Sequence, residues 1–273
     1  MTAEAASPAG DAAGDANNLL YGMHDGIGVI TFNRPKARNA LTFAMYDRLA
    51  EICRAVTAEA DVGALVLIGA GGRAFAAGTD ISSFRDIASP ADALAYERRI
   101  TEVLDAVESC PVPTIAAITG ACTGGGAAIA AACDLRIASR DLKFGFPIAR
   151  TLGNCLSIDS LARLVTLIGA GRTREIIFTA RLIGAEEAHA IGLAAEIEDD
   201  FEAVHKRALD LARTLAGHAP LTLRATKEAL RRLRLRMADA DDHDLITLCY
   251  MSEDFREGQA AFLEKRPPVW KGR

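Results

Sequence analysis

Short apolar runs alternate with longer segments of helical periodicity along the first half of the chain. Continuous apolar runs are typical of strands that are buried on both faces, and a β-rich segment bounded by turn residues indicates a further strand. Apolar residues three and four positions apart predict a helix from Leu41 to Glu59, capped by Thr42, and another from about Pro90 to Glu108. The expected strands are residues 27–32, 64–68, 114–118, 135–138 and 142–146.

Beyond Leu156 the apolar spacing is mostly helical, and neither a linker nor a short internal repeat divides the chain. Strands that alternate with helices, followed by a helical third, predict one α/β domain with a helical extension. We place the core at residues 19–200 and a helical C-terminal region of the same domain at 201–273. Residues 1–18, mostly Ala, Gly, Ser, Asp and Asn, are expected to be a disordered tail.

The composition is that of an ordinary globular protein. Half of the 273 residues are hydrophobic and 25% are charged, and the formal net charge of -5 carries no global signature of nucleic-acid binding. No apolar run is long enough for a membrane span, and residues 1–18 lack the apolar stretch of a secretion signal. The six cysteines show neither CxxC pairs nor metal-ligand spacing, so we expect reduced thiols, no metal and a cytoplasmic location.

Two glycine-containing loops directly follow two of the most apolar strands. Residues 75–81 read FAAGTDI, and residues 120–126 read GACTGGG. A strand that runs into glycines and then a helix directs free N–H groups at one point, which the helix dipole makes favourable for negative charge. Two such loops can form an oxyanion hole for a thioester carbonyl, although a tight turn is the simpler interpretation of either loop alone.

The chain resembles the enoyl-CoA hydratase/isomerase (crotonase) family over nearly all of residues 20–273. Five motifs match in the right order: residues 33–41 (NRPKARNAL), 76–81 (AAGTDI), 120–126 with 133–138 (CDLRIA), 184–188 with 191–193, and 252–258 with 262–266. The resemblance implies an α/β fold, a crotonase-like spiral of ββα units with a helical C-terminal trimerisation region. It also implies an assembly as a homotrimer or a dimer of trimers.

The resemblance assigns roles residue by residue. The N–H groups of Thr79 and Gly125 should be the oxyanion donors. Coenzyme A should enter as part of the substrate, with no tightly bound cofactor. The residues expected to border it are Lys36, Ala37, Arg38, Ala77, Asp80, Ile81, Phe262 and Lys265.

The chain departs from the family at the residues that transfer protons. Hydratases of the family use two glutamates, one to activate water and one to protonate carbon, because burial can tune the pKa of a carboxylate. The first stands three residues after the oxyanion glycine, where this chain has Ala128. The second follows the proline of a Phe-Gly-x-Pro stretch, where Ile148 and then Ala149 follow Pro147. We therefore predict little or no standard hydration.

The loop at residues 149–160 is where we expect residues that could replace the two missing glutamates. Its polar candidates are Arg150, Asn154, Cys155, Ser157 and Asp159. Asp159 is the candidate acid or base, with a helix cap or first-turn acid as the alternative. Arg150 is a candidate partner for a carboxylate on the acyl group, with a structural ion pair as the alternative. Cys155 is favoured as a packing residue over a nucleophile, because no histidine lies near it in the sequence.

The run RRLRLR at residues 231–236 predicts the end of an amphipathic helix, with its arginines toward solvent or at the C-terminal dipole. Contact with CoA phosphates, a subunit interface and RNA are the alternatives. For function we favour an acyl-CoA lyase or isomerase of the hydratase type, in fatty acid metabolism, with a non-standard reaction. An isomerase, hydrolase or decarboxylase that uses the 149–160 loop, and a non-catalytic acyl-CoA- or RNA-binding relative, remain open. We expect neither RNA nor a membrane as the partner.

Overall fold

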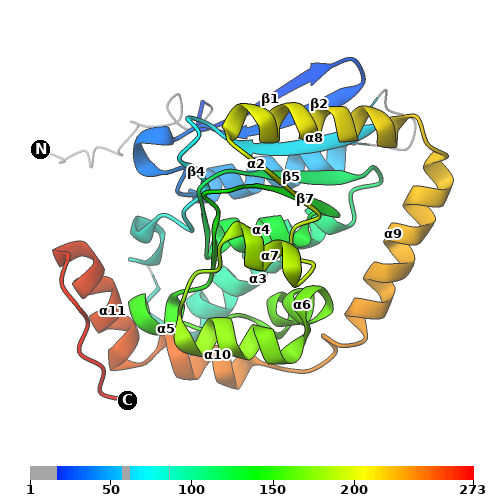
Figure 1. The fold of residues 1–273 in the computed structure, drawn as a ribbon. Helices are drawn as coiled ribbons and strands as arrows, with labels where there is room; N and C mark the ends of the chain where they lie inside the picture. The colour runs from blue at the N-terminus through cyan, green and yellow to red at the C-terminus, as the bar shows by residue number, and fades with distance from the viewer. Residues whose placement is uncertain (1–16, 57–61, 86) are drawn as a thin grey trace, which may run out of the picture.

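The computed structural model describes residues 17–56, 62–85 and 87–273 (Figure 1). Residues 1–16 of the expected tail, and the last residues of the helix expected to reach Glu59, lie outside the described residues. Asn17 and Asn18 form a turn, and their carbonyl oxygens accept hydrogen bonds from the side-chain amide and the backbone N–H of Asn33. The described chain therefore starts with a turn tied to the end of the second strand.

Six strands form the larger sheet, in the order β1-β2-β3-β5-β7-β9. β1 and β2 are an antiparallel hairpin, whose turn residues Asp25 and Gly26 both have positive φ, the conformation that a two-residue Asp-Gly turn requires. The other neighbouring strands pair in parallel. The strands are β1 (Leu19–His24), β2 (Ile27–Phe32), β3 (Ala64–Gly69), β5 (Thr114–Ile118), β7 (Leu135–Ser139) and β9 (Glu196–Glu198).

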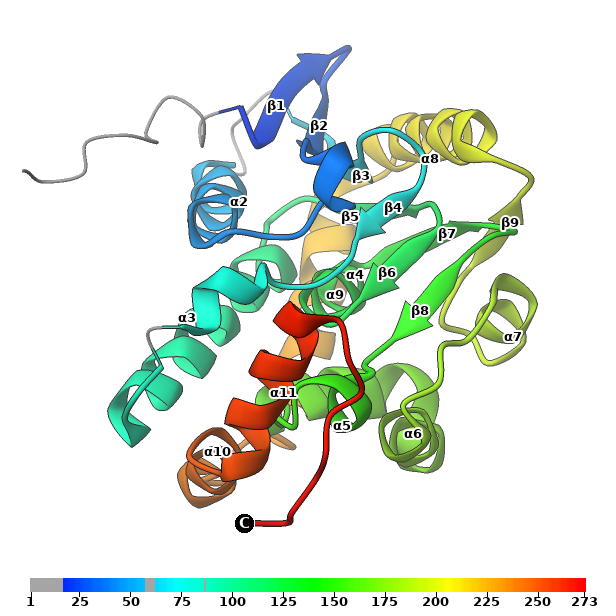
Figure 2. The ribbon, with the colours of Figure 1, turned by 90° about the vertical axis from the view of Figure 1, so that its left-hand side faces the viewer.

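A second, smaller sheet is built from three short parallel strands, β4 (Ala74–Ala76), β6 (Ala121–Thr123) and β8 (Lys143–Gly145). Figure 2 shows them side by side in that order. Each comes directly after a strand of the larger sheet and before a helix: α3 (Pro90–Glu108), α4 (Gly125–Ala132) and α5 (Ile148–Thr151). This repeated ββα unit confirms the expected spiral.

Helices cover both faces of the larger sheet, which is why its central strands are continuous apolar runs. Alternate residues such as Val66 and Ile115 pack against α8, while Leu67 and Ala116 face the main core on the other side. Among the described residues, no helix combines the length and apolarity needed to span a bilayer. The remaining helices are η1 (Pro35–Ala37), α2 (Phe43–Ala55), η2 (Ile81–Phe84), α6 (Ile158–Thr179), α7 (Ala185–Ala190), α8 (Phe201–Ala216), α9 (Pro220–Leu235), α10 (His243–Tyr250) and α11 (Glu253–Glu264).

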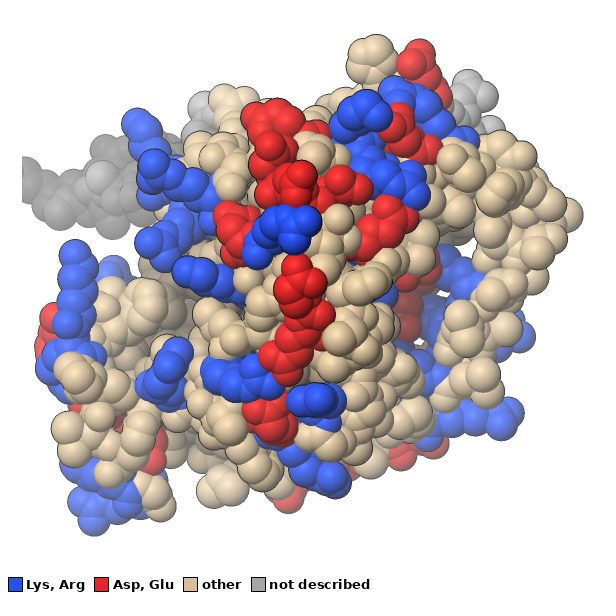
Figure 3. Space-filling view, in the orientation of Figure 1, with Lys and Arg blue, Asp and Glu red and all other residues tan. Residues whose placement is uncertain are grey.

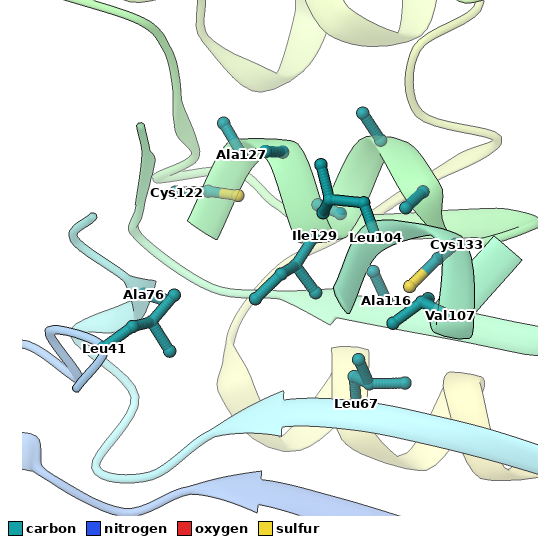
Figure 4. Close-up of a cluster of buried hydrophobic side chains, with 14 of the residues drawn as sticks. Leu41, Leu67, Ala76, Leu104, Val107, Ala116, Cys122, Ala127, Ile129 and Cys133 are labelled. Carbon is teal, nitrogen blue, oxygen red and sulfur yellow. The ribbon is translucent and has the colours of Figure 1, made fainter. Parts of the chain in front are cut away.

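Helix α4 is the centre of the main core and is made almost wholly of glycine and alanine. Small side chains let its backbone approach the strands closely, while Ile129 fills the remaining space beside Leu104 of α3 (Figure 4). The approach is closest at Gly126, where an added Cβ would lie 2.2 Å from the carbonyl oxygen of Ala76. The position of α4 against β4 therefore depends on the absence of a side chain.

The expected strands at 27–32, 64–68, 114–118, 135–138 and 142–146 are all found, as are the two expected helices and the Thr42 cap. Four strands were not expected: β1, β4, β6 and β9. β4 and β6 are only three residues long and lie in segments whose glycines indicate loops. β9, also three residues long, lies beyond Leu156 in the part of the chain that was expected to be mostly helical.

Arg234, in the arginine run at 231–236, lies in the last turn of α9 as one alternative expected, but it does not face solvent. Only 3% of its side chain is exposed, and it is paired with acidic residues of α3 and α6. Arg163 of α6, 2% exposed, shares the same partners. We call this group the arginine clasp; its members are Arg163, Arg234, Asp105, Glu108 and Asp159. The clasp ties α9 to α3 and α6 by charge.

Replacing one buried arginine of the clasp should destabilise the protein, because the carboxylates that it neutralises stay behind. We expect Arg234→Met to lower the free energy of unfolding by about 3–5 kcal/mol. Arg232→Met is the control: that arginine is exposed and pairs on the surface with Glu228, so its loss should cost no more than about 1 kcal/mol. Urea denaturation followed by circular dichroism measures both. Equal effects of the two substitutions would contradict a stabilising role for the clasp.

Candidate active site

A cavity of about 730 Å³ opens where the first turn of α4 faces the loop that follows β4. Its floor contains Gly78 and Thr79 from that loop and Gly124 and Gly125 from the start of α4. Its walls come from α2, α3, α5 and α11, so segments from both ends of the described chain enclose one space. We call this cavity the cleft.

The backbone around Thr79 is fixed by a bridge to Leu41. The N–H of Leu41 donates to the carbonyl oxygen of Gly78, and the N–H of Asp80 donates to the carbonyl oxygen of Leu41, both at 2.8 Å. Successive peptide groups of an extended chain point to opposite sides, so the N–H of Thr79 points away from Leu41. Gly78 has a φ of 104°, which a residue with a side chain rarely adopts.

Gly125 is the first residue of α4, so its N–H belongs to the turn whose donors have no partner within the helix. An added Cβ on Gly125 would lie 1.9 Å from the hydroxyl oxygen of Tyr46 and 3.1 Å from Oγ1 of Thr79. The structure therefore brings the two expected oxyanion residues into neighbouring positions. No larger residue fits at 125 while Tyr46 keeps its place.

Two tyrosines hold the side chain of Thr79 from either side. The hydroxyl of Tyr46 in α2 lies 2.9 Å from Oγ1 of Thr79, and the hydroxyl of Tyr96 in α3 lies 3.1 Å from the same atom. Burial raises the pKa of both phenols above the ordinary value, so both stay protonated at neutral pH. This trio was not predicted from the sequence, because its members come from three separate elements.

Most of the residues expected to border coenzyme A line the cleft. They are Ala37, Arg38, Ala77, Asp80, Ile81 and Phe262. Lys36 and Lys265 are exposed and lie outside the lining. Phe262 reaches the cleft from α11, which packs beside α5 (Figure 2). One wall of the cleft is thus supplied by a helix far along the chain from the glycine loops.

Comparisons with known proteins agree with this architecture. The family model for enoyl-CoA hydratase/isomerase matches residues 22–273. The chain belongs to the enoyl-CoA hydratase/isomerase family. It is similar to the short-chain-enoyl-CoA hydratase of Clostridium acetobutylicum, with 32% identity over 92% of this chain and 97% of that one. It is also similar to the 2,3-dehydroadipyl-CoA hydratase of Escherichia coli, with 31% identity over 94% of this chain and 100% of that one.

Solved structures of the family show the same fold. A methylmalonyl-CoA decarboxylase in complex with 2-nitronate-propionyl-CoA superposes with a TM-score of 0.83 at 27% identity, over 94% of this chain and 99% of that one. An enoyl-CoA hydratase/carnithine racemase from Magnetospirillum magneticum gives a TM-score of 0.76 at 32% identity, over 94% of this chain and 96% of that one. Proteins named for different reactions of CoA thioesters therefore share this architecture.

Ala128 and Ile148, the positions that the resemblance matches to the two glutamates of the family's hydratases, both line the cleft. Ala128 comes from the first turn of α4 and Ile148 from the start of α5; both are nearly buried. Neither side chain can bind or transfer a proton. The part of the wall that would activate water in a hydratase is therefore apolar in this family member.

The structure corrects both site predictions from the 149–160 loop. Asp159 lies in the first turn of α6, and its two oxygens accept hydrogen bonds from Arg163 and Arg234 in the clasp, outside the cleft lining. Arg150 is exposed on α5 and does not line the cleft either. Sequence proximity to the site misled both predictions, because α5 and the turn after it direct these side chains elsewhere.

The other polar residues of that loop divide between packing and the cleft. Ser157 caps α6, its hydroxyl accepting from the N–H of Ser160. Cys155 is partly buried, and its Sγ lies 3.7 Å from the carbonyl oxygen of Leu245. Asn154 and Ser160 line the cleft. Asn154 is the one member of the candidate set that reaches both the cleft and the polar network described next.

Glu97 is the cleft residue that the sequence reasoning missed. It follows Tyr96 on α3, is only 6% exposed and lines the cleft. The hydroxyl of Tyr250 donates to its Oε1 at 2.5 Å, and Nδ2 of Asn154 donates to the oxygen of Tyr250 at 3.2 Å. A signal existed: residues 93, 97, 100, 104 and 107 form the buried stripe of α3, and Glu97 is its only charged member. A carboxylate inside an apolar helical stripe is a candidate functional group.

The surroundings of Glu97 favour its protonated form. Burial raises its pKa to about 7, the charge of Asp242 adds to this, and the hydrogen bonds from Tyr250 and the backbone of Ser157 act in the opposite direction. A carboxyl with a pKa near neutrality exists in both protonation states under physiological conditions. It is therefore suited to take up and release a proton.

The raised pKa predicts how stability depends on pH. Between about pH 4.5 and 7 the unfolded chain loses the Glu97 proton first, so the folded state loses stability as the pH rises, by about 3 kcal/mol in total. Glu97→Gln removes this ionisation, so its stability relative to the wild type should rise by that amount between pH 5 and pH 8.5. Chemical denaturation at both values measures it. Glu102→Gln, on an exposed position of the same helix, should show no such change.

Proposed function

We propose that this chain is an enzyme that binds an acyl-CoA thioester and stabilises the enolate of its acyl group. In this proposal the N–H groups of Thr79 and Gly125 donate to the thioester oxygen. The observation that carries it is how near the two loops lie: a Cβ on Gly125 would be 3.1 Å from Oγ1 of Thr79, beside the Tyr46 hydroxyl that contacts the same atom. Preorganised donors of this kind stabilise developing negative charge because they do not have to reorient during the reaction.

The mouth of the cleft supports a CoA ester as the ligand. Its cationic lining residues, Arg38, Arg85 and Lys143, are exposed, and they suit the phosphates of coenzyme A. Asp80 is held by Arg34 at 2.8 Å; although partial burial opposes it, the hydrogen bonds from Arg34 and Ser82 lower the pKa of Asp80. The curated relatives are named as hydratases of enoyl-CoA and dehydroadipyl-CoA, which are CoA thioesters.

The reaction that we propose is not standard hydration. Hydration needs a group that activates water and one that protonates carbon, and the corresponding positions are Ala128 and Ile148. One structural relative is named a decarboxylase, so a thioester enolate formed in this fold is not tied to adding water. We place the chain among the family's lyases and isomerases and develop the choice between them below.

We also propose a trimer-based assembly. α9 and α10 carry exposed apolar side chains, and a hollow of about 620 Å³ separates α9 from the body of the molecule. Figure 3 shows openings between this helix and the body, while acidic and basic side chains intermingle over the rest of the face. An apolar surface of this extent favours a protein partner. The exposed apolar residues are Leu221, Leu230, Leu233, Leu245 and Leu248.

Crotonyl-CoA should bind and be hydrated only slowly. The two missing acid–base groups contribute about 10²- to 10⁴-fold each in enzymes that have them, and the two effects are not additive. We expect kcat/KM well below about 10⁶ M⁻¹s⁻¹ in a steady-state assay of the loss of the conjugated thioester absorbance. The hydratase from Clostridium acetobutylicum serves as the positive control. A rate as high as that of the control would refute this prediction.

In light scattering at micromolar concentration, the wild type should have three or six times the monomer mass of 28.9 kDa. The double substitution Leu230→Asp/Leu233→Asp should shift the mass toward the monomer, because it places charges on the exposed apolar face of α9. Leu20→Asp, on β1, is the control for an exposed leucine outside that face. A monomeric wild type, or equal effects of both changes, would contradict the assembly through α9.

A further inference from the structure

Glu97 is a carboxylic acid in the cleft, and it stands at neither of the two positions that the resemblance matches to the family's glutamates. Among the described residues, the acidic side chains that line the cleft are Asp80 and Glu97. Asp80 is tied to Arg34 and to Ser82, and its pKa is lowered, so it is a weak base. Tyr46 and Tyr96 keep their protons at neutral pH and can only donate hydrogen bonds. Glu97 is the remaining group that can accept a proton from carbon.

Helix α3 places Glu97 in a fixed relation to the proposed oxyanion site. Tyr96, the preceding residue, contacts Oγ1 of Thr79 at 3.1 Å, so the same helical turn touches the oxyanion loop and presents the carboxyl. On the other side, the Tyr250 hydroxyl donates to Glu97 and is itself held by Asn154. The rings of Tyr96 and Tyr250 lie 5.9 Å apart. The Glu97 carboxyl is thus positioned by Tyr96 on one side and by Tyr250 on the other.

Asn154 adds an independent observation. Its Oδ1 is buried and has no hydrogen-bond partner, although its amide nitrogen donates to Tyr250. Buried polar atoms without partners are rare, and a catalytic role is one of the explanations for such an atom. When Glu97 is protonated, it can donate to the Tyr250 oxygen, and the Tyr250 hydroxyl can then turn to Oδ1 of Asn154 once that amide rotates. The network therefore has a hydrogen-bonded arrangement for each protonation state of Glu97.

We propose that Glu97 is the proton-transferring residue of this enzyme and that the reaction is the shift of a double bond in an acyl-CoA from position 3 to position 2. This rests on the proposed binding of the thioester by Thr79 and Gly125. The Glu97 carboxylate takes a proton from C2, and the C–H electron pair moves into the thioester to give a dienolate. The Glu97 acid then returns the proton to C4, and the C2–C3 double bond forms. No water, oxidant or cofactor is consumed.

A single acid–base group favours this reaction over hydration. A double-bond shift needs one carboxyl, because the same group removes and returns the proton. Addition of water needs a second group, and Ala128 and Ile148 cannot supply it. The lining of the cleft also indicates the acyl group. Ile100 and Leu156 line the cleft, and the cationic side chains among the described lining residues are the exposed ones at its mouth. An uncharged, apolar acyl chain is the substrate class that fits.

The test uses the full-length protein with trans-3-hexenoyl-CoA and follows the absorbance of the conjugated 2-enoyl product. We expect turnover by the wild type and a loss of about 10²- to 10⁴-fold in kcat for Glu97→Gln. Glu97→Gln should bind cinnamoyl-CoA with a dissociation constant within about threefold of that of the wild type. It should also keep the red shift in cinnamoyl-CoA absorbance that a polarised carbonyl produces. Glu102→Gln is the matched control on the same helix and should keep full activity. Unchanged turnover by Glu97→Gln would overturn the proposal.

The pH dependence of turnover separates proton transfer from a structural role. The rate should rise with pH through the pKa of Glu97, near 7, because the carboxylate is the active form. Tyr250→Phe removes a hydrogen bond that lowers this pKa, so the profile should move to higher pH, whereas a merely structural residue would change the rate without moving it. The other titratable groups that face Glu97 are Tyr46, Tyr96, Cys155 and Asp242.

Two further outcomes separate this proposal from the one on which it rests. Wild-type protein that binds cinnamoyl-CoA and shifts its absorbance, yet does not convert trans-3-hexenoyl-CoA, would overturn the role of Glu97 and leave the oxyanion site standing. Wild-type protein that binds no CoA ester would overturn both. If Glu97→Gln fails to fold, Glu97→Asp replaces it, and the same loss of turnover with retained binding is expected because the shorter acid no longer reaches the carbon.

Discussion

The cleft depends on one close contact between two backbones, that of the first turn of α4 and that of β4 with its following loop. At Gly126 there is space for a hydrogen atom but not for a methyl group beside the carbonyl of Ala76. At Gly125 the Tyr46 hydroxyl occupies the volume that a side chain would need. Two N–H groups can share one acceptor only when their chains are this near. The proposed oxyanion site therefore requires the small residues of α4. The larger sheet, its covering helices and the tyrosines around Thr79 all keep this contact in place.

The fold was largely predictable because its signals are local. A strand buried on both faces has to be continuously apolar, and β3 and β5 are; a helix with one buried side shows its period, as α3 does. The short strands β4 and β6 were not predictable, because three residues beside glycines carry no period. Their strand geometry comes from pairing with each other and with β8, which no local pattern records.

The site was predictable in its backbone and not in its acid–base residues. The two glycine loops are visible in the sequence, and the family resemblance assigned Thr79 and Gly125 within them to one site. Asp159 looked like a replacement acid only because it is near Ile148 in sequence, whereas Arg163 and Arg234 bind both of its oxygens. Glu97 comes from a helix that ends before the second glycine loop begins. Its relation to Tyr250, 153 positions along the chain, exists only in the folded molecule.

The segments that form the cleft are translated at different times. Both glycine loops and Glu97 lie within the first half of the chain, whereas Phe262 and Leu263, which close one wall, come from α11. A ribosome that has translated the spiral core has therefore made both glycine loops but not the surface that completes the cavity. Because domains fold as units and α11 packs against α5 in the wall of this cleft, the complete cavity forms only after the last helix has been translated.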